Sequence, residues 1–421
     1  MKKFKKIAVF STLALALFAA TAGSMAACGS ADASDLMSGV AAGPANGKPP
    51  DPAFIESMAN FSVELFKNSM ADQDNSLISP LSAMLALAMA ANGAEGETLA
   101  QMESLLGRGI PLGDLNEYLK GYARGLSSGK KSKLNIANSI WFRDDEDHLQ
   151  VSEGFLQRNA DYYGASAHKA AFDGNTLKSI NGWVKSQTGG MIDKMLLAIK
   201  KDAVMYLLNA VAFDAEWQDV YSEGSVCEGL FTDVNGENQD AEFMNSVEYI
   251  YLEGGRETGF VKPYAGGTYS FAALLPDAGI PIGEYARSLS GAEFLNLLEN
   301  AQSVRVNASM PRFEFACETK MNEVLKGLGM PLAFDPIRAD FSRMATSPEE
   351  NIYISEALHK AFIAVDELGT KAGAATKVVM ETFGTISESK SVTLDRPFLF
   401  AIIDNATNLP VFLGTALGMA I

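Results

Sequence analysis

The sequence has few of the side chains that bind metals or form disulfides. Its 421 residues include only three cysteines and three histidines. One disulfide is the most that can form, which excludes a disulfide-stabilised scaffold; the cysteines are Cys28, Cys227 and Cys317. The latter two lie in unrelated segments and are interpreted as free or buried thiols. The histidines are far apart in the chain, so we expect no metal site and no cofactor.

Positive charge is also scarce. The chain has 34 Lys and Arg against 51 Asp and Glu, a net charge of −17. A nucleic-acid-binding protein needs a basic surface to neutralise phosphates, so this balance argues against that class. With 48% hydrophobic and 20% charged residues, the composition is typical of a globular protein and excludes a largely disordered chain.

The N-terminus has the layout of an export signal over residues 1–28. Four lysines lie within Met1–Lys6, and the apolar stretch Ile7–Ala20 is short for a membrane span. The ending Met25-Ala-Ala-Cys28 resembles a bacterial lipobox, in which the cysteine is lipidated; the alternative is ordinary cleavage that leaves Cys28 unmodified. We therefore expect an exported protein, either a cell-surface lipoprotein or extracellular, that contacts a membrane only through a lipid anchor at Cys28.

The rest of the chain divides into a linker and one large domain. Residues 29–52 are rich in Gly, Ala, Ser, Asp and Pro, which predicts a flexible linker. Residues 53–421 contain no second break of this kind. Helices are predicted over 54–71 and from Ser79-Pro80 to Asn92-Gly93, and strands over 134–142, 203–213, 304–315 and 361–366. Helices first and mixed strands later indicate the α+β class.

Catalytic motifs are tested and rejected. Gly125-Leu-Ser-Ser-Gly129 has the letters of a nucleophile elbow, but a helical stretch precedes it and a lysine-rich turn, 130–133, follows it. That turn is interpreted as solvated, with polyanion binding as the alternative. The chain has no glycine-rich phosphate loop, no Cys-x-x-Cys and no His-Glu-x-x-His. We therefore do not expect an enzyme.

The C-terminal part resembles the serpins, the serine protease inhibitor family. Residues 354–376 resemble the family's hinge region, and 392–402 resemble the signature that follows its reactive loop. Further segments match in order along the domain: Asn75–Gly107, Asn181–Thr188, Leu208–Ala210, Glu216-Trp217, Met310–Phe313 and Ala339–Ser342. Gly190-Met191 departs from the family's usual Gly-Lys-Ile.

The resemblance implies a fold with an N-terminal helical region, three β-sheets and an exposed reactive-centre loop. It implies a suicide-substrate inhibitor whose partner is a target serine protease held in a covalent complex. We also expect a monomer and, from the charge balance, no nucleic-acid partner. The protease attacks the loop, and the loop then inserts as a new strand into the main sheet before the acyl-enzyme is hydrolysed. The alternative is a non-inhibitory serpin-fold binding protein, against which the small residues of 372–375 argue.

The resemblance also assigns residues of the loop. The hinge comprises Glu367, Gly369, Thr370, Ala372, Ala374 and Ala375. In the family the scissile residue lies about sixteen positions after the hinge glutamate, which gives the bond Phe383–Gly384, with Thr382 as second choice for the residue before the cut. Phenylalanine there suits a chymotrypsin-like protease, whereas threonine suits an elastase-like protease.

A loop that becomes a central strand must alternate between two faces. From Thr370 to Glu381, every even-numbered residue is uncharged, and all three charges have odd numbers: Lys371, Lys377 and Glu381. Insertion therefore need not bury an unpaired ion, which would cost several kcal/mol.

Two further groups are assigned by the resemblance. A polar cluster beneath the main sheet, the shutter cluster, comprises Ser79, Ser82, Asn209 and His359. Trp217 matches the tryptophan at the breach, where insertion begins. Without the resemblance, His359 and Trp217 would be interpreted as ordinary core residues.

Overall fold

The computed structural model describes residues 33–126, 131–144, 149–348, 351–370 and 389–419. The helices of these residues are α1 Pro52–Ser69, α2 Pro80–Ala91, α3 Gly96–Leu106, α4 Leu112–Gly125, α5 Glu153–Tyr163, α6 Gly174–Gln187, α7 Ile282–Ser288, α8 Gly291–Glu299 and α9 Met321–Gly327, with short 3₁₀ turns at Glu223–Ser225 and Pro331–Phe334. The predicted helices 54–71 and 80–92 correspond to α1 and α2. Asp51 and Ser79 cap their N-termini, and a proline follows each cap.

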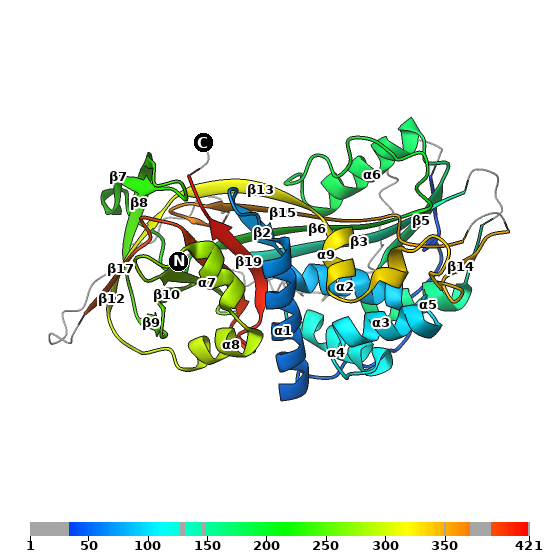
Figure 1. Ribbon diagram of the computed structural model, residues 1–421, viewed down its shortest axis with the longest axis horizontal. Helices are drawn as coiled ribbons and strands as arrows, with labels where there is room; N and C mark the ends of the chain where they lie inside the picture. Colours follow the sequence, from blue (N-terminus) through cyan, green and yellow to red (C-terminus); the bar gives the residue numbers. More distant parts are fainter. Residues whose placement is uncertain (1–32, 127–130, 145–148, 349–350, 371–388, 420–421) are drawn as a thin grey trace, which may run out of the picture.

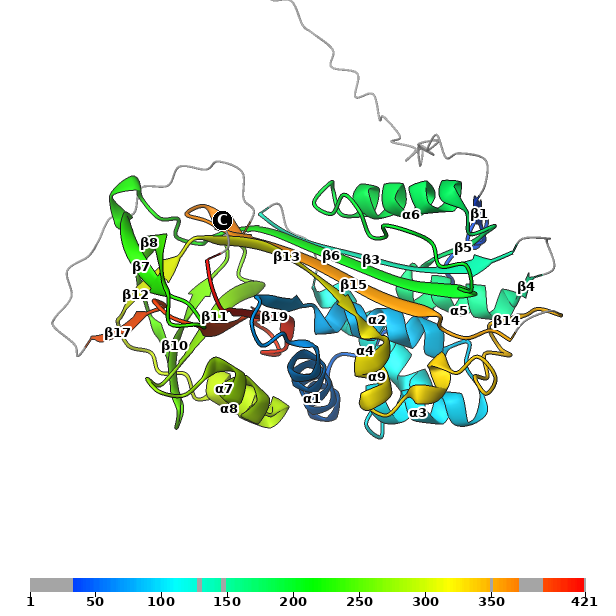
Figure 2. The same cartoon turned by 45° about the horizontal axis from the view of Figure 1, so that its top comes forward.

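A seven-stranded sheet runs along the long axis of the molecule (Figure 1). Its order is β1 Ala33–Asp35, β5 Ser166–Ala170, β3 Ser132–Arg143, β6 Met205–Glu216, β16 Gly369–Thr370, β15 Glu356–Val365 and β13 Phe313–Lys320. The predicted strands 134–142 and 203–213 are β3 and β6. Helix α6 lies on one face of this sheet, and α1–α5 and α9 lie on the other (Figure 2). We call it the main sheet.

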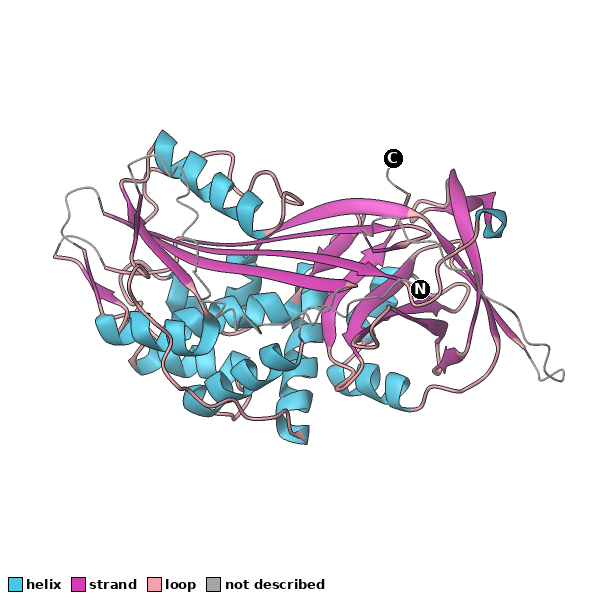
Figure 3. Ribbon diagram, turned by 180° about the vertical axis from the view of Figure 1, so that it is seen from behind, coloured by secondary structure: helices cyan, strands magenta, loops and turns pink. Residues whose placement is uncertain are grey.

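The six-stranded and four-stranded sheets lie toward one end of the molecule (Figure 3). A six-stranded sheet has the order β2 Ser76–Ile78, β19 Pro410–Ala416, β18 Phe398–Asp404, β11 Tyr269–Pro276, β10 Glu257–Pro263 and β9 Ile250–Glu253. A four-stranded sheet has the order β17 Lys390–Thr393, β12 Val306–Pro311, β8 Asn238–Glu248 and β7 Val226–Thr232. A short pair, β14 Ala345–Thr346 with β4 Gln150–Val151, adds to the three sheets expected. The α+β class is confirmed.

Two apolar cores lie against the two faces of the main sheet. The larger core contains α2, all of whose residues are buried. The smaller core lies between α6 and the sheet, and includes Ile180 and Val184 of α6 with Trp141, Tyr206 and Leu358 of the strands. Since β6 is buried on both faces, its residues form the near-continuous apolar run that predicted a central strand.

The predicted strand 304–315 is wrong as a single element. It is divided between β12 in the four-stranded sheet and β13 in the main sheet. The change of sheet occurs at Arg312, whose backbone N–H donates to the carbonyl of Glu242, 2.8 Å away. The predicted strand 361–366 is too short, because β15 begins at Glu356 and contains His359.

The described part of the predicted flexible linker, residues 33–51, is held against the domain. Ala33 and Asp35 of β1 pair with Ala170 and His168 at the edge of the main sheet. Farther along, the backbone N–H of Lys48 donates to the carbonyl of Glu117, 2.9 Å away. Backbone pairing with an exposed strand edge orders a segment whose own composition has no apolar period.

Several predicted features lie outside the described residues: the export signal with Cys28, part of the rejected Gly125–Gly129 motif, and the loop residues 371–388. Cys227 and Cys317 are described, and both are free thiols. Burial raises the pKa of the Cys317 thiol to about 11.

Candidate functional site: the opening of the main sheet

The hinge already forms a short strand in the main sheet. Gly369 and Thr370 pair antiparallel with Glu216 and Ala215 of β6, and Thr370 also pairs with Val365 of β15. Farther down, β6 and β15 pair directly with each other, from Tyr206–Glu356 to Ala212–Phe362. The two strands therefore part above this point, and β16 occupies the gap.

A tight turn directs the chain from β15 into this gap. The Asp366 carboxylate accepts hydrogen bonds from the backbone N–H groups of Leu368 and Gly369, at 2.8 and 3.0 Å. The backbone N–H of Asp366 donates in turn to the carbonyl of Gly369. An aspartate that bonds the backbone two and three residues ahead is a usual stabiliser of such turns.

Gly369 is required by the close approach of β6. A Cβ atom added at this position would lie 2.0 Å from the carbonyl oxygen of Ala215, which is backbone and cannot move aside like a side chain. The structure thus supplies the physical reason for the glycine that the family resemblance assigned to the hinge.

Thr370 points into the core beneath the sheet. Its side chain is fully buried, and its hydroxyl lies 2.5 Å from the hydroxyl of Tyr264. The Tyr264 ring stacks on Trp217, with centroids 4.4 Å apart and planes 10° from parallel. Burial raises the pKa of Tyr264 well above its usual value, so this phenol stays protonated and able to donate.

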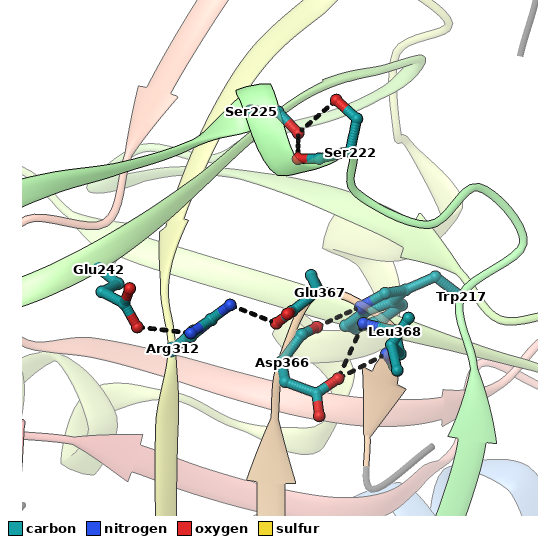
Figure 4. Close-up of polar contacts among 9 residues, drawn as sticks. Trp217, Ser222, Ser225, Glu242, Arg312, Asp366, Glu367 and Leu368 are labelled. Atoms are coloured by element: carbon teal, nitrogen blue, oxygen red, sulfur yellow. Dashed lines mark hydrogen bonds and ion pairs between the residues drawn. The ribbon is translucent and has the colours of Figure 1, made fainter. Parts of the chain in front are cut away.

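Trp217 also holds the turn before the hinge (Figure 4). Its indole Nε1–H donates to the carbonyl of Asp366 at 2.8 Å, and its backbone N–H donates to that of Leu368 at 2.9 Å. The backbone N–H of Tyr221 donates to the carbonyl of Glu367 at 3.0 Å. Three successive carbonyls of the turn are therefore fixed by one short segment that follows β6.

Arg312 links the hinge to the four-stranded sheet (Figure 4). Its guanidinium forms ion pairs with Glu367 at 2.7 Å and with Glu242 of β8. All three side chains are partly exposed, so we attribute to this bridge a role in position more than in stability. It also fixes the position of Glu367, which the family resemblance assigned to the hinge.

A buried ion pair behind Trp217 was not predicted from the sequence. Lys262 is 2% exposed and forms an ion pair with Glu248, 2.8 Å away. Its ammonium lies 4.4 Å from the centre of the Tyr221 ring and 5.4 Å from that of Trp217. Burial alone would lower the pKa of Lys262, but Tyr221 and the Glu248 carboxylate outweigh burial and raise it. The ion pair therefore stays charged.

The four predicted residues of the shutter cluster come together beneath the main sheet, and all are buried. The backbone N–H of Ser79 donates to Nε2 of His359 at 3.0 Å, and Nδ1 of His359 bonds to the side-chain oxygen of Asn209. The Asn209 amide donates to the carbonyl and hydroxyl oxygens of Ser82. This network joins β6 and β15 to the start of α2.

The geometry fixes the protonation state of His359. Since Nε2 accepts a hydrogen bond, the ring is neutral and carries its proton on Nδ1, which donates to Asn209. Complete burial lowers the pKa of His359 to about 3.

Asn138 is a fifth member of the network that sequence reasoning missed. It lies directly opposite Asn209 in the pairing of β3 with β6, as His359 does in the pairing of β15 with β6. The Asn209 amide also donates to its side-chain oxygen. Only the strand register identifies it, because an asparagine in a strand carries no signal of its own.

The remaining predicted site residues lie outside the described residues: Cys28, Ala372, Ala374, Ala375, Thr382, Phe383 and Gly384. Within the described ranges, no group of three or more His, Cys, Asp and Glu side chains could hold a metal ion. Within the same ranges, no helix is long and apolar enough to cross a membrane.

Comparison with known proteins identifies this architecture. Residues 56–418 match the family described as serpin, serine protease inhibitor. Human serpin B8 is 30% identical over 376 residues, which cover 85% of this chain and 97% of serpin B8. The chain belongs to the serpin family, whose members are in general protease inhibitors, although some are non-inhibitory.

Solved structures of the thermophilic serpin tengpin are also similar. Its native state has a TM-score of 0.89 at 55% identity, covering 92% of this chain and all of that one. Its latent state has a TM-score of 0.79 at 53% identity, covering 89% of this chain and all of that one. The described fold is thus nearer to the native than to the latent structure.

Proposed function

We propose that this serpin is an extracellular inhibitor of chymotrypsin-like or elastase-like serine proteases, which it traps as a suicide substrate. The observation that carries the proposal is the position of Gly369 and Thr370 between β6 and β15. The upper end of the gap into which a cleaved loop must insert is already open and holds these two residues, whereas farther down β6 and β15 would have to part. Insertion would continue an existing strand rather than begin a new one.

The observed register predicts where the rest of the loop would pair. Continuing the antiparallel pairing of Thr370 with Ala215 places Thr376 opposite Asn209. Continuing the pairing of Thr370 with Val365 places Thr376 opposite His359. The pairings with β6 and with β15 predict the same register, so the loop can insert without a shift in register. Thr376 would then separate the two partners of the shutter hydrogen bond.

The length of β6 matches the loop. In the same register, Met205–Glu216 of β6 would face 369–380 of the inserted strand. The side chains with even numbers would follow Thr370 into the core, and Lys371, Lys377 and Glu381 would point toward the other face. No charge would enter the larger core, which supports insertion; Lys377 would lie opposite Leu208 of the smaller core, so insertion also requires α6 to shift and admit this ammonium to water.

The scissile bond in this proposal is Phe383–Gly384, with Thr382 as the alternative residue before the cut. The protease would form an acyl bond to Phe383 and would be carried past the lower end of β6 as the loop inserts. The proposal places this event outside the cell, on a monomer exported by residues 1–28 and anchored through a lipid on Cys28.

The stability of the loop-cleaved protein tests the insertion step. Cutting the loop with a trace of thermolysin, with the cut located by mass spectrometry, should raise the thermal unfolding midpoint strongly, because the free segment adds a central strand. An unchanged midpoint would favour the non-inhibitory binding protein over the inhibitor.

A further inference from the structure

Helix α6 and the segment that follows it carry a local excess of positive charge. Residues 166–204, from the start of β5 to the residue before β6, have six lysines and three aspartates in a chain whose net charge is −17. Three of these lysines, Lys178, Lys194 and Lys201, are exposed and have no ion-pair partner among the described residues. A local positive surface on an acidic protein points to an anionic partner.

An exposed leucine lies between two of these lysines, Lys194 and Lys201, in the sequence. The segment after α6 places Ile192, Met195 and Leu196 in the smaller core, whereas the Leu197 side chain is 85% exposed. Asn181 of α6 fixes the segment, because its side-chain oxygen accepts hydrogen bonds from the backbone N–H groups of Met195 and Leu196 at 2.7 and 2.9 Å. Leu197 is therefore held outward on a rigid support.

Helix α6 lies beside the point where the described chain begins. Ala33 of β1 pairs with Ala170 of β5 and packs against the smaller core beneath α6 (Figure 2). Cys28 is five residues earlier, so an extended chain can separate it from Ala33 by at most about 18 Å. β17, where the described chain resumes after the loop, lies at the other end of the molecule in the same view.

We infer that the face formed by Lys178, Lys194, Leu197 and Lys201 docks on an anionic lipid bilayer. Lysines bind to acidic headgroups, and an exposed apolar side chain between them enters the interfacial layer. A basic, apolar-tipped face would hold the domain itself against the bilayer, beside a lipid anchor at Cys28. The inference uses the proposed anchor at Cys28 for proximity, but the docking face exists without it.

Vesicle sedimentation of the chain without its first 28 residues, and so without lipid, tests the docking. Wild-type protein should bind phosphatidylglycerol-rich vesicles, lose this binding as salt rises, and ignore pure phosphatidylcholine vesicles. Each lysine near an acidic surface is worth about fivefold in affinity, so Lys178→Glu, Lys194→Glu and Lys201→Glu together should weaken binding about 100-fold or more. Equal retention on both lipids would overturn the inference.

The matched control changes the same charge elsewhere. Arg124 of α4, Arg158 of α5 and Arg305 are also exposed cations without ion-pair partners among the described residues. Arg124→Glu, Arg158→Glu and Arg305→Glu should weaken binding far less than the three lysine changes. An equal loss would mean that net charge alone, not this face, is responsible, and would contradict the inference.

The variant Leu197→Ser distinguishes binding to a bilayer from binding to a soluble polyanion. It should weaken vesicle binding about tenfold through lost apolar burial, and leave any binding to dextran sulfate unchanged. Dextran sulfate binding as tight as vesicle binding, with no effect of Leu197→Ser on either, would assign the face to a polyanion instead. These measurements contain no protease. Membrane docking can therefore be disproved while protease inhibition is observed, and inhibition can be disproved while docking is observed.

An environment-sensitive dye reports the orientation directly. Placed on a Leu197→Cys, Cys227→Ser variant, the dye should shift to the blue on phosphatidylglycerol-rich vesicles. The same dye on the natural Cys227, exposed on β7, should not shift. A shift at Cys227 alone would place the opposite end of the molecule on the membrane and refute the inference.

Discussion

The hydroxyl groups of Thr370 and Tyr264 lie 2.5 Å apart in the core beneath the main sheet. This contact joins the first inserted residues of the reactive loop to the aromatic stack of Tyr264 and Trp217. The hinge is therefore seated in the sheet by side-chain contacts as well as by backbone pairing.

Thr370→Arg should convert the inhibitor into a substrate. Since position 370 is fully buried, a guanidinium there would have to be buried without a partner or keep the hinge out of the sheet. Measured against chymotrypsin, the stoichiometry of inhibition should rise by about tenfold or more. Thr370→Val, which keeps the shape, should change it little. An SDS-stable protease complex retained by the arginine variant would contradict the role given to insertion.

Gly369→Ala should displace β16. The added methyl group would meet the Ala215 carbonyl oxygen at 2.0 Å, so we expect a loss of about 1–3 kcal/mol in stability and slower trapping of protease. The control is Gly255→Ala, where no atom lies within 4 Å of the added group. Thermal unfolding and the rate of complex formation measure both effects, and equal behaviour of the two variants would be evidence against the close approach.

The native state should lose stability as the pH falls below about 6.5. The pKa of His359 is about 3 in the folded protein, below its unfolded value, so the unfolded chain binds the proton more readily. Stability is complete above the unfolded pKa, and falls by up to about 1.4 kcal/mol per pH unit between 6.5 and 3.

His359→Asn should flatten this part of the pH profile of the unfolding midpoint. Burial also lowers the pKa of His168, which contributes in the same direction. His168→Asn is therefore the control, and should flatten the profile less. A His359→Asn profile as steep as that of the wild type would show that His359 is not the neutral, buried group described.

Breaking the ion pair behind Trp217 should be costly. Lys262→Met leaves the buried Glu248 carboxylate without its cation, at an expected cost of about 3–5 kcal/mol in stability. Lys262→Met combined with Glu248→Leu should recover most of this loss. Arg256→Met removes a partner of an exposed pair with Glu284 and should cost about 1 kcal/mol or less. A double variant as unstable as Lys262→Met would mean that packing, not charge, dominates.

Local patterns predicted α1, α2, β3 and β6, because helix caps and the spacing of apolar residues are features of neighbouring positions in the sequence. They did not predict the break at Arg312, since the strand pattern continues through it while the partner strands change. They also failed for residues 33–51, whose order comes from pairing with an edge strand far along the chain. Order of this kind is set by tertiary contacts and not by composition.

The site shows the same division. Hinge and shutter residues could be assigned by family resemblance, but Asn138 and Lys262 could not. Asn138 needs the strand register, and a lysine within a strand is normally interpreted as exposed. The only sequence signal for the burial of Lys262 was the alternation of side chains along the strand. Lys262 is two residues after Phe260 and so lies on the same strand face, and Phe260 is fully buried.

Incubation with chymotrypsin, followed by denaturing gel and mass analysis, tests the central claim most directly. An inhibitor that works by loop insertion should give a covalent complex of serpin and protease, together with a released peptide that begins at Gly384. A peptide that begins at Phe383 would move the scissile bond to Thr382. Complete cleavage in the loop without any covalent complex would contradict the claim that this serpin traps its protease.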